Sequence, residues 1–85
     1  MKVTRELAAA KLAAYLHHSL PLEELAGWAE DMIMEGEFPA GDSALRDVVA
    51  RLGLADVREF GLAWDDCEDF LSLLGYRAKL EIVAA

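Results

Sequence analysis

Apolar residues recur at helical spacing in four stretches of the chain, and Pro or Gly residues fall between those stretches. A repeat of three or four residues is typical of a helix that buries one side. Gly and Pro are the residues that most often end helices or form the turns between them. The pattern predicts helices over Thr4–Ser19, over Leu22–Gly36, from a cap at Asp42 or Ser43 to Gly53, and over Trp64–Leu74.

The segment Leu22–Gly36 has the clearest two-sided pattern. At 100° per residue its apolar side chains gather on one side of the helix. They are Leu22, Leu25, Ala26, Ala29, Met32 and Ile33. The opposite side is acidic and carries Glu23, Glu24, Asp31 and Glu35. Trp28 falls between the two sides and Met34 lies near the acidic one, so we expect both to serve as apolar anchors of an interface.

The end of the chain changes to an alternating pattern of apolar and mostly charged residues. A period of two residues predicts a β-strand over 76–84. A strand needs a partner for its backbone groups. The candidates are Met1–Thr4, Val57–Leu62 and the same strand of a second subunit. The stretch Leu54–Leu62 fits either a helical turn or extended chain.

These elements predict a mainly α fold, a small bundle of about four helices with a single C-terminal β-strand. Because 85 residues is the length of one domain, we expect residues 1–85 to form a single helical domain. The predicted core consists of Leu12, Leu16, Leu25, Ala29, Ile33, Val49, Leu52, Phe70, Leu71 and Leu74.

Acidic residues are concentrated in one part of the chain. The whole sequence has 16 acidic and 8 basic residues and a formal net charge of −8. Between Leu12 and Leu45 lie seven acidic residues and no Lys or Arg. Such a surface repels nucleic acid and anionic membranes and attracts cationic proteins. The alternative is that the acids only keep an apolar chain in solution, although the second helix then forgoes every stabilising Glu–Lys pair.

The apolar content points to self-association. Hydrophobic residues make up 55 % of a chain whose core is thin for its size. An exposed apolar patch is therefore expected, and such patches mark partner surfaces, which favours a homo-oligomer. No stretch approaches the ~18 apolar residues of a membrane span. The N-terminus also lacks the apolar core of a signal peptide, so we expect a cytoplasmic protein.

No catalytic, cofactor or metal site is predicted. Cys67 is the only cysteine and falls among apolar helix positions, and the acids beside it would raise its pKa. His17 and His18 are adjacent, so their rings diverge and cannot share a metal as residues four apart would. Arg46 and Arg51 are too few cations for a DNA-recognition helix.

The runs Leu22–Asp31 and Glu35–Phe38 resemble a pattern of short bacterial helical proteins with no assigned activity. Arg46–Val49 and Trp64–Cys67 are similar to segments of the same proteins. The resemblance extends over most of the chain and implies no functional residues. In size and acidity the chain is also similar to bacterial immunity proteins and antitoxins, which neutralise basic toxins. That similarity is an analogy without a shared motif.

Three functional hypotheses follow. The first is a non-enzymatic protein–protein interaction module that binds a basic protein partner through Glu23, Glu24, Trp28, Asp31, Met34 and Glu35. The second is a small enzyme or ligand-binding protein with a site at a homodimer interface, using Tyr15, His18 or Cys67. The third is a structural subunit whose strand over 76–84 adds to the sheet of a partner.

Overall fold

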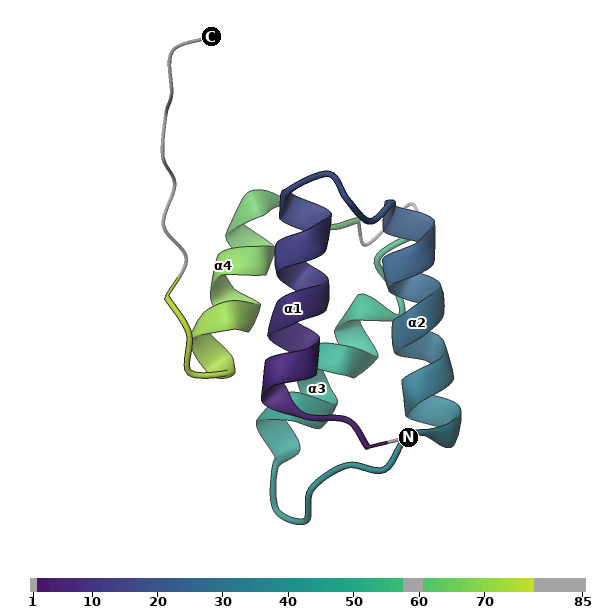
Figure 1. The fold of residues 1–85 in the computed structure, drawn as a ribbon, viewed down its shortest axis with the longest axis vertical. Helices are drawn as coiled ribbons and strands as arrows, with labels where there is room; N and C mark the ends of the chain where they lie inside the picture. The colour runs from purple at the N-terminus through teal and green to yellow at the C-terminus, as the bar shows by residue number, and fades with distance from the viewer. Residues whose placement is uncertain (1, 58–60, 78–85) are drawn as a thin grey trace, which may run out of the picture.

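Four helices form the described part of the molecule, which confirms the mainly α prediction. The computed structural model describes residues 2–57 and 61–77. The helices are α1 (Arg5–Leu16), α2 (Leu22–Glu35), α3 (Ser43–Leu52) and α4 (Trp64–Leu73). In Figure 1, α1 stands between α4 and α2, runs antiparallel to α2, and has α3 behind it. Helix α3 packs against the other three helices, whereas α4 contacts α1 and α3 but not α2.

Helix α1 begins where the sequence predicts and ends earlier. The Thr4 hydroxyl accepts a hydrogen bond from the Leu7 N–H at 3.0 Å, so Thr4 is the predicted cap. The helix ends at Leu16, three residues before the predicted end, because His18 has a left-handed backbone with φ of 62°. The Ser19 N–H then donates to the Ala14 carbonyl at 2.8 Å and closes the turn.

Helices α2 and α3 match their predicted bounds to within a residue. Gly36 ends α2, and a Cβ on it would stand 2.6 Å from both the Val3 Cγ2 and the Met32 carbonyl oxygen. Val3 is fully buried against this spot, which the helical pattern did not indicate. Asp42 caps α3 by accepting a hydrogen bond from the Leu45 N–H at 3.2 Å, as expected.

Most of the predicted core is buried. Seven of its members are inaccessible or nearly so, namely Leu12, Leu25, Ala29, Val49, Leu52, Leu71 and Leu74, and the same cluster includes Val3. Leu16 and Phe70 are half-buried at its edge. The prediction for Ile33 is wrong, because its side chain is 38 % exposed. Val3 packs against the end of α2 at Gly36, and Ile33 is neither in the core cluster nor among the partly buried residues packed against it.

The N-terminal segment is tied to the loop between α2 and α3. Lys2 and Glu37 form a parallel β-bridge, with the Val3 N–H donating to the Glu37 carbonyl at 2.8 Å. Arg5 donates two hydrogen bonds to the Asp42 carboxylate, each 2.8 Å long. These contacts join residues far apart in sequence and fix α1 relative to the start of α3.

The predicted strand over 76–84 lies mostly outside the described residues. Only Tyr76 and Arg77 of that segment are described, and neither is in a strand. Within Leu54–Leu62, residues 54–56 form turns and Val57 lies in a bend. The Val57 N–H donates to the Leu54 carbonyl at 3.0 Å, and the Gly61 N–H donates to the Val57 carbonyl at 3.0 Å. The bonding at 54–57 fits the helical-turn interpretation, and for residues 58–60, which lie outside the described ranges, both interpretations stay predictions.

Candidate interaction surface on helix α2

The outward side of α2 is acidic along the whole helix. Six of its residues are exposed, and Gly27, which lies between them, is half-buried. We call this surface the α2 outer face, and it consists of Glu23, Glu24, Gly27, Glu30, Asp31, Met34 and Glu35. It includes every residue of the predicted partner-binding set except Trp28. It also includes Gly27 and Glu30, which the sequence analysis did not assign to it.

Gly27 occupies the middle of this face. Its neighbours three and four positions away on the helix surface are Glu23, Glu24, Glu30 and Asp31, all of them carboxylates. A Cβ on Gly27 would have no neighbouring atom within 4 Å. A glycine inside a helix costs roughly 0.5–1 kcal/mol relative to alanine. No contact in the described chain therefore requires a glycine at position 27, in contrast to position 36, where a Cβ would be too close to its neighbours.

No carboxylate of the α2 outer face takes part in an ion pair within the described part of the chain. The Arg5–Asp42 ion pair, at 2.8 Å, lies at the other end of the α2–α3 loop and involves none of them. Lys11, on α1, has its ammonium group 5.6 Å from the centre of the Trp28 ring. The negative field of the face is therefore directed outward, which favours encounter with a cationic partner.

The two expected anchors differ in their surroundings. Met34 is 79 % exposed and stands on the α2 outer face. Trp28 is half-buried and packs against the core cluster beneath Lys11, toward α1. Its indole N–H is buried and has no hydrogen-bond partner within the described residues. Met34 is thus the exposed apolar side chain on this face, whereas Trp28 packs at the contact between α1 and α2.

The residues of the enzymatic hypothesis are not arranged as a reactive group. Cys67 is fully buried in the core, and burial together with the nearby Asp66 raises its pKa to about 11. A buried thiol with a raised pKa is a poor nucleophile at neutral pH. His18 is exposed in the turn after α1, and Tyr15 is half-buried. No cluster of three or more His, Cys, Asp or Glu side chains suited to a metal ion occurs in the described ranges.

One sequence signal could have located the centre of the face. Gly27 is the only glycine predicted to lie inside a helix rather than at its end or in a loop. Its ring of acids is visible at the spacings of three and four residues. The packing of Trp28 toward Lys11 has no such signal, because it depends on how α1 and α2 are placed.

Comparison of the chain with known proteins identified no relative. Within residues 2–57 and 61–77, no helix combines the length and the hydropathy needed to cross a membrane. No family model, curated protein or solved structure was found to match this chain.

Proposed function

We propose that this chain is a non-enzymatic interaction module that binds a basic protein partner through the α2 outer face. The observation that carries the proposal is Gly27 within its ring of four carboxylates, Glu23, Glu24, Glu30 and Asp31. The glycine weakens the helix and the acids repel one another, so both features cost folding stability. Both costs are offset if a cationic side chain of another protein seats there.

The shape at Gly27 supports close approach of a partner. Without a Cβ, the helix surface is lower there than at the surrounding positions, and nothing within the described chain fills the space. A Lys or Arg side chain placed over Gly27 would lie within reach of carboxylates on both sides. Because a guanidinium pairs with two oxygens in one plane, Arg would be held more strongly than Lys.

Charge and apolar contact have separate roles in this proposal. The carboxylates mainly increase the rate of association, since rim charges act on diffusional encounter. Met34, exposed at the end of the same face, supplies apolar area that is removed from water on binding. The affinity is therefore expected to fall with salt without disappearing.

Affinity capture from a lysate of the source cells tests the proposal. The wild-type chain is compared with the double charge reversal Glu24→Lys/Asp31→Lys. We expect one basic protein to be retained by the wild type, released as salt rises, and lost from the reversed variant. Its association rate with the purified wild-type chain should fall by about tenfold or more between low and physiological salt.

The matched control reverses two exposed acids of α4, Glu68→Lys/Asp69→Lys. This variant has the same net charge as the α2 variant and leaves the α2 outer face intact. Retention of the partner by the control and not by the α2 variant would support the proposal. Equal retention by both variants, or no basic protein from the wild type, would contradict it.

A further inference from the structure

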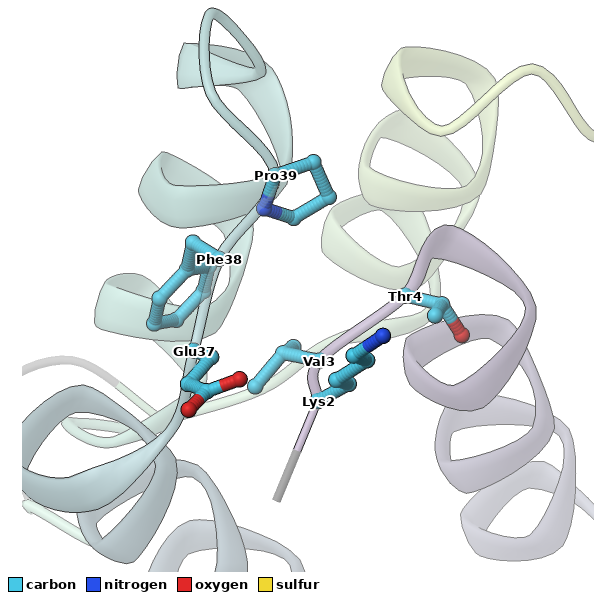
Figure 2. A pocket seen from close by; sticks show the side chains of 6 residues that line it. All are labelled: Lys2, Val3, Thr4, Glu37, Phe38 and Pro39. Carbon is cyan, nitrogen blue, oxygen red and sulfur yellow. The ribbon is translucent and has the colours of Figure 1, made fainter.

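A pocket lies where the N-terminal segment meets the loop after α2. Its volume is about 300 Å³, and it is lined by Lys2, Val3, Thr4, Glu37, Phe38 and Pro39. Figure 2 shows Phe38 and Pro39 on one side of it, Lys2 and Thr4 on the other, and Val3 between them. The pocket is separate from the α2 outer face and is not used by the proposed function.

The walls of this pocket bear two opposite charges that do not pair. Lys2 and Glu37 are partners in the parallel bridge, so their backbones are fixed relative to each other. Figure 2 shows the ammonium group of Lys2 and the carboxylate of Glu37 on different sides of Val3. Within the described residues, the Arg5–Asp42 pair is the ion pair present, and neither Lys2 nor Glu37 takes part in one. Both groups are therefore available to a third molecule.

Val3, Phe38 and Pro39 form the apolar part of the lining, and the first two are held by contacts with the rest of the molecule. Val3 is fully buried, and the Val3 N–H donates to the Glu37 carbonyl at 2.8 Å. Phe38 packs against the core cluster, and the guanidinium of Arg46 lies 4.6 Å from the centre of its ring. Such a cation–π contact restrains the ring. The apolar wall is thus formed before any ligand arrives, which lowers the entropic cost of binding.

We infer that this pocket binds a small zwitterion with an apolar side chain, of the chemical class of a free α-amino acid. The ligand carboxylate would pair with the Lys2 ammonium and the ligand ammonium with the Glu37 carboxylate. The apolar side chain would lie against Phe38 and Pro39. The volume is at the small end of ligand pockets, which favours a molecule of this size over a nucleotide or cofactor.

Titration of the ¹⁵N-labelled protein with L-leucine, followed by amide chemical shifts, tests the inference. We expect saturating shifts at the amides of Val3 and Phe38, with a dissociation constant on the order of millimolar because the pocket is open. N-acetyl-L-leucine lacks the ammonium and L-leucinamide lacks the carboxylate. Each should bind about fivefold more weakly or worse.

Two variants assign the charges and a third is the control. Lys2→Gln and Glu37→Gln should each weaken leucine binding by about fivefold or more, while Asp69→Asn, at an exposed position on α4, should leave it unchanged. Lys2 and Glu37 are exposed, so the folded state is expected to survive both changes. Absence of saturating shifts up to about 50 mM leucine would overturn the inference. Equal binding by all three variants, or by the acetylated compound, would overturn it as well. Neither result bears on the α2 outer face.

Discussion

Two glycines, one inside α2 and one at its C-cap, have opposite relations to their surroundings. Gly36 must lack a side chain, because a Cβ there would stand 2.6 Å from Val3 Cγ2 and from the Met32 carbonyl oxygen. Gly27 has open space where a Cβ would lie. The same residue type is thus required at one position by packing and at the other by nothing within the described chain. Substitution separates the two cases.

Gly27→Ala should stabilise the fold by roughly 0.5–1 kcal/mol, because alanine restricts the unfolded chain and favours the helix. Gly36→Ala should destabilise it by about 1–3 kcal/mol, since buried Val3 and the end of α2 must move apart. Urea unfolding of the two variants and the wild type measures both effects. A Gly27→Ala variant that is more stable but binds the captured basic partner less tightly would support close approach at this position. Loss of stability in Gly27→Ala would show an internal role for the glycine.

At the scale of elements, one ion pair connects the starts of α1 and α3. Arg5 on α1 donates two hydrogen bonds to the carboxylate that caps α3, and it holds the pKa of Asp42 below its usual range. The same contact raises the pKa of Arg5. Since Asp42 titrates lower in the folded state than in the unfolded chain, its contribution is complete above the unfolded pKa. It is lost as pH falls through the folded pKa.

Asp42→Asn removes the charge and keeps a side chain that can cap α3. We therefore expect this variant to be less stable than the wild type at pH 7, with a difference that narrows as pH falls below about 4. Urea unfolding of both proteins at a series of pH values measures the difference. A gap that stays constant down to about pH 2 would mean that the carboxylate charge is not its cause.

The elements themselves could be predicted, but several contacts between them could not. The sequence predicts Thr4 and Asp42 as caps, and the apolar spacing of α3 identifies its buried side. Ile33 has the same helical spacing as its buried neighbours. Whether it is buried depends on which other segment of the chain packs over its side of α2. The burial of Val3 and the pairing of Arg5 with Asp42 depend on a return of the chain, in which the loop after α2 comes back to the N-terminal segment. Local periodicity carries no information about such a return.

The α2 outer face illustrates the same limit. Its acids are visible in the sequence because helical spacing alone places them together. The orientation of Trp28 toward α1 is not visible, since it follows from how two helices pack. For the pocket lined by Lys2 and Pro39, the sequence offers no signal, because its two walls come from segments far apart in the chain that meet at the parallel bridge.

At the scale of the whole molecule, net charge opposes folding. The formal net charge is −8, and the α2 outer face concentrates repulsion on one helix. Added salt screens such repulsion, with a Debye length of about 30 Å at 0.01 M and less than about 10 Å above 0.1 M. We expect the thermal midpoint to rise as NaCl increases from about 0.01 to 0.5 M. Calorimetry in a buffer of low ionic strength measures the change.

The double variant Glu24→Gln/Asp31→Gln identifies the source of that rise. If the α2 outer face dominates the repulsion, this variant should be more stable than the wild type at low salt and should respond less to NaCl. A variant and a wild type with the same salt response would place the repulsion elsewhere in the chain.

Because Cys67 is buried on α4, thiol labelling can measure how often α4 detaches from the other helices. Helix α4 touches α1 and α3 but not α2, while the bridge at Lys2 and the Arg5–Asp42 pair lock the first three helices together. The single cysteine of the chain lies fully buried on α4. A thiol reagent can reach it only when α4 departs, so the rate of labelling reports that local opening.

We expect the free energy of opening from labelling to be smaller than the free energy of unfolding from urea. Equal values would mean that α4 leaves only when the whole molecule unfolds. The smaller value would make α4 the helix that detaches from the folded molecule most easily.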